Sequence, residues 1–273
     1  MSYDGHLAVS VRDRVATVEL QRPEVLNALH SDTHRALQRV MGELEYDDGV
    51  GAVVLRGAGR AFCSGSDLRE IGDLVGLDAR RYVRLDFTTK NRVAGLSKPV
   101  VAAIHGWCVG GGLELALACD IRIAATNAVF SMREVPLGSV PGSGGLQRLP
   151  AVVGVGVAKD WILTGRDVSA AEAERRGLVT ELVEPERLAD RAQELAAELA
   201  TRNPTALHLA KVALDPRPEA DHSLVAAFQT LAGEACHGDP SYQRATRKYT
   251  ERRAQSSDPA PAGAGDLPRE EPR

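Results

Sequence analysis

The stretch that decides the fold is Lys98-Pro-Val-Val-Ala-Ala-Ile-His-Gly-Trp-Cys-Val-Gly-Gly-Gly-Leu-Glu-Leu-Ala-Leu-Ala-Cys-Asp-Ile-Arg-Ile-Ala124. The apolar run at residues 100–104 and the segment Asp120-Ile-Arg-Ile-Ala124 both predict β-strands. The Gly triplet at 110–112 lies between them and leads into an apolar helix that extends to Cys119. Strand, helix and strand follow one another, which is typical of an α/β fold.

The same alternation continues on the N-terminal side of this stretch. Residues 6–20 alternate apolar and polar side chains around Arg12-Asp13-Arg14, which predicts a β-hairpin. Ser31 can cap a helix whose apolar residues repeat at the helical period. A strand over residues 50–55 and one helical stretch over residues 67–95 are expected next.

On the C-terminal side the pattern changes from mixed to helical. Ser169-Ala-Ala-Glu172 has the form of a capping box, and Gly177 is expected to end the short helix that it starts. A strand is expected over residues 178–183, and from residue 186 onward the periodicity is helical. The chain is therefore predicted to be α/β first and all-α last.

Composition excludes several classes of protein. The 273 residues are 44% hydrophobic and 26% charged, and the formal net charge is −4. These values indicate a globular protein without a strong positive field for nucleic acid or anionic membranes. The sequence has no apolar run long enough to span a membrane, and its first residues lack the order of a signal peptide, so a cytoplasmic location is expected.

Several catalytic and metal-binding motifs are absent from the sequence. It contains no G-x-S-x-G elbow, P-loop or complete G-x-G-x-x-G motif. The four cysteines show no C-x-x-C spacing and are interpreted as reduced thiols, so no metal site is predicted. His30 and His34 are four residues apart without a third ligand, and we interpret them as part of a solvated helix face.

One charge in the central stretch needs a separate explanation. Glu114 is the only carboxylate or permanent charge between Pro99 and Cys119. Burial would raise its pKa and suit it to proton transfer near neutral pH. Alternatively, a glutamate in the first turn can complement the helix dipole, and the segment alone does not separate the two interpretations.

Two further elements could complete a catalytic site around this glutamate. The glycines at 110–112 expose backbone N–H groups that can stabilise an oxyanion, although a Gly triplet taken alone favours close packing of helix on strand. Gly65, at another strand-to-helix crossing, can help to supply a second N–H group. Glu134 is the lone acid of the loop over residues 131–145, and on composition alone it would be an exposed loop residue.

These elements belong to a larger set of motifs that resembles one family. The motifs are Arg22-Pro-Glu-Val-Leu-Asn-Ala-Leu29, Ala61-Phe-Cys-Ser-Gly-Ser-Asp-Leu68, Lys98-Pro-Val-Val-Ala-Ala-Ile-His-Gly106, Gly110-Gly-Gly-Leu-Glu-Leu-Ala116, Cys119-Asp-Ile-Arg-Ile-Ala124, Pro136-Leu-Gly-Ser-Val-Pro-Gly-Ser-Gly-Gly-Leu-Gln-Arg-Leu149 and Leu163-Thr-Gly165. From about Val9 to Arg253 the chain resembles the crotonase superfamily of enoyl-CoA hydratases and isomerases.

The resemblance implies a spiral of β-β-α repeats followed by C-terminal helices that build a trimer or a dimer of trimers. It places the spiral core at residues 1–200 and the helical assembly region at 201–253. Residues 254–273 contain four prolines and a single large apolar side chain, so we expect a disordered tail.

The resemblance also implies the reaction, which is syn addition of water to a trans-2-enoyl-CoA. The backbone N–H groups of Ser66 and Gly111 would polarise the thioester carbonyl. Glu114 would activate the water and Glu134 would deliver a proton to C2. The alternatives are a Δ3,Δ2-enoyl-CoA isomerase or another acyl-CoA enzyme on the same scaffold, an RNA-binding relative, and a catalytically idle paralogue.

Contacts to coenzyme A follow from position in the family pattern. No cofactor is expected beyond the coenzyme A that forms part of the substrate. Arg252 is assigned as a phosphate partner, with a solvated helix end as the alternative interpretation. The residues expected at the CoA and acyl site are Leu26, Ala28, Ser64, Asp67, Leu68, Gly142, Tyr249 and Arg252.

Overall fold

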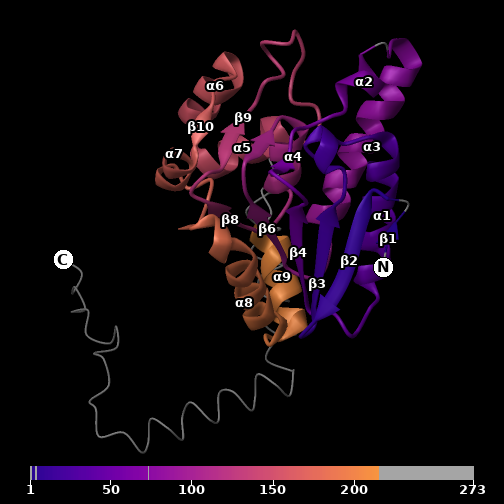
Figure 1. Cartoon of the computed structure of the whole chain (residues 1–273), viewed down its shortest axis with the longest axis vertical. Coiled ribbons are helices and arrows are strands. Elements are labelled where there is room, and N and C mark those ends of the chain that lie inside the picture. Colours follow the sequence, from indigo (N-terminus) through magenta and orange to yellow (C-terminus); the bar gives the residue numbers. More distant parts are fainter. Residues whose placement is uncertain (1, 4, 73, 215–273) are drawn as a thin grey trace, which may run out of the picture. The chain divides into compact units, whose positions relative to one another are not determined.

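The strands of the chain form two sheets, as the computed structural model shows for residues 2, 3, 5–72 and 74–214 (Figure 1). The larger sheet has the order β1-β2-β3-β4-β6-β8-β11. Its strands are β1 (Ser2–Tyr3), β2 (Leu7–Arg12), β3 (Val15–Leu20), β4 (Ala52–Gly57), β6 (Val100–Ile104), β8 (Ile121–Ala125) and β11 (Glu181–Val183). The smaller sheet has the order β10-β9-β7-β5, with β5 (Ala61–Cys63), β7 (Trp107–Val109), β9 (Val129–Ser131) and β10 (Val168–Ser169).

Helices cover these sheets and connect their strands. The α-helices are α1 (Ser31–Glu45), α2 (Leu68–Ile71), α3 (Gly76–Ala94), α4 (Gly111–Leu117), α5 (Gly145–Val153), α6 (Val155–Thr164), α7 (Ala170–Arg175), α8 (Leu188–Ala200) and α9 (Pro204–Leu214). Two 3-10 helices, η1 (Pro23–Val25) and η2 (Pro185–Arg187), lie in the connections.

The alternating direction of side chains along the central strands explains how helices and sheets are layered. Successive side chains of a strand point to opposite faces, so a strand that is apolar throughout must be covered on both faces. In β4, Ala52 and Val54 pack with the buried residues of α8, whereas Val53 and Leu55 pack in the main core with α1. The larger sheet is therefore buried between helix α8 and the rest of the core, which includes the smaller sheet.

A repeating unit connects the two sheets. Strands β4, β6 and β8 pair in parallel in the larger sheet, and each is followed by a strand of the smaller sheet, β5, β7 or β9. Strands β5, β7 and β9 also pair in parallel, whereas β10 pairs with β9 in antiparallel orientation. The chain therefore winds through both sheets in each repeat, which confirms the predicted α/β fold class and its spiral of β-β-α units.

Some predicted boundaries were wrong. The helical stretch expected over residues 67–95 is two helices, α2 and α3. Helix α1 begins at Ser31 but is capped by His30, whose Nδ1 accepts a hydrogen bond from the Asp32 N–H. Ser169 caps α7 as predicted, because its hydroxyl accepts a hydrogen bond from the Glu172 N–H, while the Glu172 carboxylate pairs with Arg166 instead of completing a capping box.

The predicted assembly region is described only in part. Helix α9 confirms helical structure at its start, and residues 215–273 lie outside the described residues. Among the residues described here, none of the helices is long and apolar enough to cross a membrane. The division at residue 200, the C-terminal tail and the cytoplasmic location stay predictions.

Candidate active site

The start of helix α4 combines close packing with free backbone donors. A methyl group on Gly112 would lie 2.3 Å from the Cys63 carbonyl oxygen, so only glycine permits this approach of helix and strand. Gly110 has a φ of 52° and donates its N–H to the Ser131 carbonyl oxygen. The packing interpretation of the Gly triplet is therefore correct for Gly112.

The backbone N–H groups of Ser66 and Gly111 lie side by side. A methyl group on Gly111 would lie 3.4 Å from the Ser66 nitrogen, and one on Gly65 would lie 3.2 Å from the Gly111 nitrogen. Gly65 has a φ of 101°, a conformation that side chains rarely adopt. Within the described part of the chain, neither N–H group donates a hydrogen bond to another residue. Two such donors can share one oxyanion.

The carboxylate of Glu114 is buried, and this residue follows Gly111 by one turn of the same helix. Its side chain is on helix α4 and the residue is only 2% exposed. Oε1 accepts hydrogen bonds from the N–H groups of Ser143 and Gly145, at 2.8 and 2.9 Å. Burial raises the pKa of Glu114, although nearby Lys90 and these two N–H groups oppose the shift. Glu114 is therefore buried and held on one oxygen, as expected for a functional carboxylate.

Glu134 lies close to the same point but in a different environment. A methyl group on Gly110 would lie 2.9 Å from Glu134 Oε1, so the loop carboxyl lies against the start of α4. Its Oε2 is buried and has no hydrogen-bond partner among the described residues. Burial raises the pKa of Glu134 to about 7, and the neighbouring Glu114 adds to the shift. The interpretation of Glu134 as an exposed loop acid was wrong.

The residues expected near coenzyme A gather around the turn after η1. Leu26 accepts a hydrogen bond from the Ser64 N–H through its carbonyl oxygen, and the Ala28 carbonyl oxygen accepts one from Arg22. Arg22 also pairs with Asp67 at 2.9 Å. The structure therefore brings Leu26, Ala28, Ser64 and Asp67 together.

The other residues expected to contact substrate are more dispersed. Leu68 follows this cluster and is exposed at the start of α2. Gly142 lies on the loop before α5, where a methyl group would lie 3.6 Å from Val83 of α3. Tyr249 and Arg252 lie outside the described residues. Their expected contacts with coenzyme A stay predictions.

Comparison with known proteins adds to this geometry. Residues 10–257 match the enoyl-CoA hydratase/isomerase family. The chain belongs to this family. A short-chain-enoyl-CoA hydratase of Clostridium acetobutylicum is 40% identical over 241 residues, which cover 88% of this chain and 92% of that protein. A crotonyl-CoA hydratase of Syntrophomonas wolfei is 32% identical over 254 residues, which cover 93% of this chain and 97% of that protein.

A solved structure of an enoyl-CoA hydratase has the same fold as this chain. The crystal structure of an enoyl-CoA hydratase from Bacillus anthracis superimposes with a TM-score of 0.86 at 35% identity. The match covers 90% of this chain and 96% of that chain. The resemblance that the motifs indicated is confirmed.

Sequence reasoning missed a set of polar residues beside Glu114. Lys90 and Asp86 of α3 are buried and form an ion pair. His34 is also fully buried, 3.4 Å from Asp86, so its placement on a solvated face was wrong. The available signal was the spacing on α3, where Asp86 and Lys90 fall on the same face as the buried Tyr82 and Val93.

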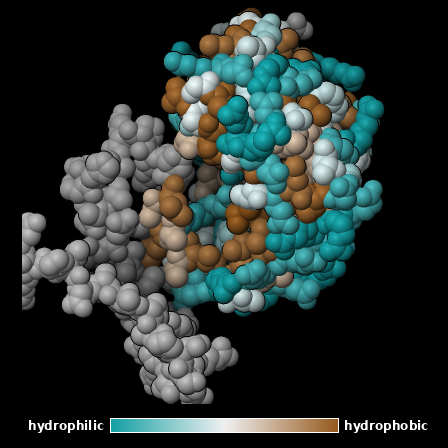
Figure 2. Space-filling view, turned by 90° about the vertical axis from the view of Figure 1, so that its left-hand side faces the viewer, coloured by the Kyte–Doolittle hydropathy of each residue, from teal (hydrophilic) through white to brown (hydrophobic). Residues whose placement is uncertain are grey.

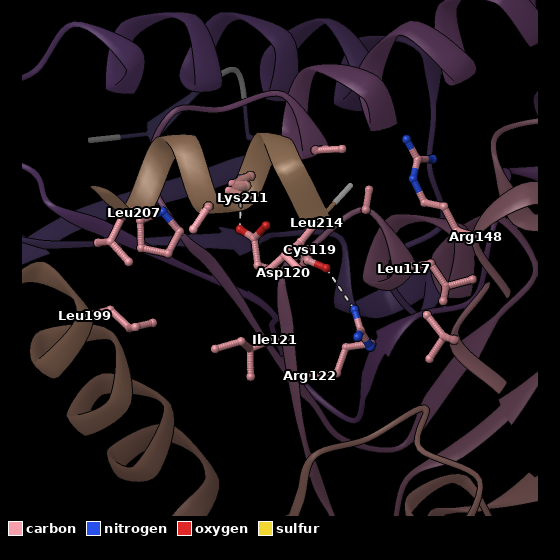
Figure 3. A pocket seen from close by; sticks show the side chains of 15 residues that line it. Leu117, Cys119, Asp120, Ile121, Arg122, Arg148, Leu199, Leu207, Lys211 and Leu214 are labelled. Carbon is pink, nitrogen blue, oxygen red and sulfur yellow. Dashed lines mark hydrogen bonds and ion pairs between the residues drawn. The ribbon is translucent and has the colours of Figure 1, made fainter. Parts of the chain in front are cut away.

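A separate cavity of about 370 Å³ lies between α9 and the start of β8, away from these residues (Figure 3). The charged side chains Asp120 and Arg122 that line this cavity form ion pairs or hydrogen bonds with neighbouring residues. Asp120 pairs with Lys211 at 2.8 Å, and Arg122 donates to the carbonyl oxygens of Cys119 and Leu178. None of the residues predicted to bind substrate lines this cavity.

No group of three or more His, Cys, Asp and Glu side chains in the described ranges could hold a metal ion. Cys63, Cys108 and Cys119 are buried free thiols, and burial raises the pKa of each.

Proposed function

We propose that this protein is an enoyl-CoA hydratase that adds water syn across a trans-2-enoyl-CoA to give a 3-hydroxyacyl-CoA. One observation carries the proposal. Two backbone N–H groups, of Ser66 and Gly111, lie side by side at the start of α4. The buried Glu114 follows Gly111 by one turn of the same helix, and the half-buried Glu134 lies against Gly110. A hydratase needs this combination, because it stabilises an enolate oxygen while one proton is removed from water and another is delivered to carbon.

The reaction divides between the two carboxyl groups. Glu114, as a carboxylate, takes a proton from water while the water oxygen forms a bond to C3. The electron pair of the C2–C3 double bond moves toward the thioester carbonyl, whose oxygen is stabilised by the N–H groups of Ser66 and Gly111. Glu134 then gives its proton to C2. Proton exchange with solvent returns Glu114 to the carboxylate form and Glu134 to the acid form.

The different surroundings of the two glutamates support this assignment of roles. Glu114 accepts two backbone hydrogen bonds and lies near Lys90, and these contacts favour the ionised form. Glu134 has a buried oxygen without a partner and a pKa raised to about 7. An acid with such a pKa is suited to deliver a proton near neutral pH.

Relatives support the substrate class. One is named short-chain-enoyl-CoA hydratase and another crotonyl-CoA hydratase. We therefore propose acyl-CoA thioesters as substrates, used in fatty acid metabolism. The backbone around Leu26 and Ala28, with Ser64, Asp67 and Leu68, is assigned to coenzyme A, and Gly142 to the acyl and water site. These assignments follow the family pattern at each position.

Self-association as a trimer or a dimer of trimers is the remaining part of the proposal. Figure 2 shows apolar side chains gathered beside a hollow on one face of the molecule. Large apolar side chains of α5, α6 and α9 are exposed, namely Leu146, Val155, Leu163 and Leu214. Exposed apolar surface of this kind supports an interface, and sedimentation of the full chain would give the number of subunits.

One assay tests the reaction. The conjugated thioester absorbs in the ultraviolet, so hydration of crotonyl-CoA should make this absorbance fall. With a 3-enoyl-CoA as substrate, the absorbance of the conjugated thioester should rise only slowly, because isomerisation to the 2-enoyl-CoA is at most a minor activity. A rise from the 3-enoyl substrate without any loss from 2-enoyl substrates would instead favour the Δ3,Δ2-isomerase.

A further inference from the structure

A buried lysine lies beside the catalytic glutamate. Lys90 is on α3, it is 0% exposed, and its Nζ forms an ion pair with Asp86 one helical turn earlier. The same Nζ lies 3.9 Å from Glu114 Oε2. Lys90 therefore faces the oxygen of Glu114 that the backbone N–H groups of Ser143 and Gly145 do not hold.

Asp86 connects this lysine to the other oxygen of Glu114. Its Oδ2 accepts a hydrogen bond of 2.5 Å from the Ser143 hydroxyl, and the Ser143 N–H donates to Glu114 Oε1. The contacts form a closed circuit from Lys90 through Asp86 and Ser143 to Glu114 and back to Lys90. Helix α3 and the loop before α5 thus hold Glu114 from two sides.

An ion pair in this position is costly. Removing an ammonium and a carboxylate from water carries a desolvation penalty that their mutual attraction often fails to repay. Apolar residues of similar size would fill the same space, and the flanking residues Tyr82 and Val93 of α3 are largely apolar and buried. A buried charge next to a catalytic carboxylate suggests that the charge itself has a use.

We propose that Lys90 and Asp86 are a positioning pair, in which the Lys90 ammonium holds Glu114 as a carboxylate and Asp86 limits that effect while it anchors Ser143. The proposal deepens the function given above, because it rests on Glu114 as the base that activates water. It assigns a role in the reaction to two residues of α3 that contact Glu114 only through charge and through Ser143.

The charged and titratable groups around Glu114 come from three elements. Helix α3 contributes Lys90 and Asp86, and α1 contributes His34. Burial lowers the pKa of His34 to about 4, so His34 is neutral near pH 7. The loop after β9 contributes Glu134, while the segment before α5 contributes only backbone N–H groups.

These neighbours act on Glu114 in opposite directions. Burial raises the pKa of Glu114, Lys90 lowers it and Asp86 raises it. Burial acts in the same direction on Asp86, but the Lys90 ammonium holds the pKa of Asp86 below its ordinary value. Removal of Lys90 and removal of Asp86 should therefore move the titration of Glu114 in opposite directions.

The test is a pH titration of the Glu114 carboxyl by 13C NMR in the full chain labelled at glutamate Cδ. The Glu114 resonance is assigned by its loss in Glu114→Gln. Lys90→Met should raise the midpoint by at least about one pH unit, because the nearby positive charge is lost. Asp86→Asn should lower the midpoint, and Lys90→Met/Asp86→Asn should bring it back toward that of the unsubstituted protein.

Controls come from the same helix. Arg81 and Asp78 form an exposed ion pair on α3, so Arg81→Met and Asp78→Asn should leave the Glu114 midpoint unchanged. Lys90→Arg retains the charge and should stay close to the native midpoint. Thermal unfolding of each variant establishes that it is folded. If Asp86→Asn does not fold because Lys90 is left without its ion-pair partner, the double variant removes both charges and takes its place.

Two results would overturn the proposal. One is a Glu114 midpoint in folded Lys90→Met that equals that of the unsubstituted protein. A Glu114 midpoint in the double variant that equals that of Asp86→Asn would have the same meaning. The other is a shift in the same direction for Lys90→Met and Asp86→Asn, which would indicate a general loss of packing. The titration needs no substrate, so a protein that hydrates no 2-enoyl-CoA yet shows the opposite shifts would refute the proposed function and leave the positioning pair standing.

Discussion

The two sides of the catalytic site hold the same kind of side chain in unlike ways. On the helical side, Glu114 of α4 accepts two backbone hydrogen bonds and lies near the Lys90 ammonium. On the loop side, Glu134 has an oxygen that is buried without a partner. Glu114 accepts hydrogen bonds from the N–H groups of two other residues and has the Lys90 ammonium at 3.9 Å, whereas Glu134 accepts one only from its own backbone N–H.

In the proposed reaction, this difference allows two glutamates of one fold to serve as a base and an acid. Burial raises the pKa of both, and for Glu134 the pKa reaches about 7. Hydrogen bonds to a carboxylate favour its charged form, whereas a buried oxygen without donors favours the protonated form. Glu114 is thereby suited to accept a proton from water and Glu134 to give one to carbon.

Substitution of Glu114, the proposed base on α4, should have the largest effect. Glu114→Gln should lower kcat for hydration of crotonyl-CoA by at least about a hundredfold, because the amide cannot accept the proton of water. The measurement is the steady-state loss of thioester absorbance. Glu174→Gln on the exposed surface of α7 is the matched control and should be unchanged. Near-native turnover in Glu114→Gln would remove it from the mechanism.

Loss of the acid breaks the loop side. Glu134→Gln should also lower kcat by at least about a hundredfold, because C2 loses its proton donor. Carried out in D2O with NMR detection, the same reaction should show slower incorporation of deuterium at C2. A variant that retains hydration at the native rate would show that another group protonates C2.

Crowding of the backbone donors should have the next largest effect. A methyl group on Gly65 would lie 2.9 Å from the Val109 carbonyl oxygen and 3.2 Å from the Gly111 nitrogen. Gly65→Ala should therefore displace the donor pair and lower kcat by about tenfold to a hundredfold. Gly156→Ala is the control, since a methyl group there meets nothing within 4 Å. Equal activity of both variants would contradict the assigned oxyanion site.

The pH dependence sharpens the comparison without any substitution. Glu134 has to be protonated to act as an acid, and its pKa is raised to about 7. The value of kcat/KM should hence be high below this pH and fall by up to about tenfold per pH unit above it. A second fall at lower pH should report protonation of Glu114. A flat profile from neutral to alkaline pH would contradict the role of Glu134.

The smallest effect is expected for the side chain of Ser66. The donor assigned there is the backbone N–H, so Ser66→Ala should change kcat by less than about threefold. Steady-state kinetics with crotonyl-CoA gives the value. A loss comparable to that of Gly65→Ala would mean that the Ser66 hydroxyl takes part in the reaction.

Much of the fold could be predicted because its signals are local. The apolar runs around Val100 and Ile123 and the Gly triplet before α4 predict strands and a helix without knowledge of distant contacts. Helices α5 and α6 were not expected, because their region begins in a loop rich in glycine and proline and Pro150 lies inside α5. Propensity argued against a helix there, and tertiary packing prevailed.

The candidate site was only partly accessible from the sequence. Glu114 could be found because it is a single charge in an apolar run. The raised pKa of Glu134 depends on its contact with the start of α4, which its own loop does not reveal. Lys90 and Asp86 carry no motif that points to the site, and the packing of α3 against α4 together with the contact to Ser143 shows that they are buried beside Glu114.

The central claim is that the two glutamates titrate apart, with Glu114 as the carboxylate and Glu134 as the acid. A pH titration of both side-chain carboxyls by 13C NMR in the substrate-free protein tests it most directly. The Glu134 midpoint should lie near pH 7 and above that of Glu114. A Glu134 midpoint at or below that of Glu114 would contradict the division of roles between them.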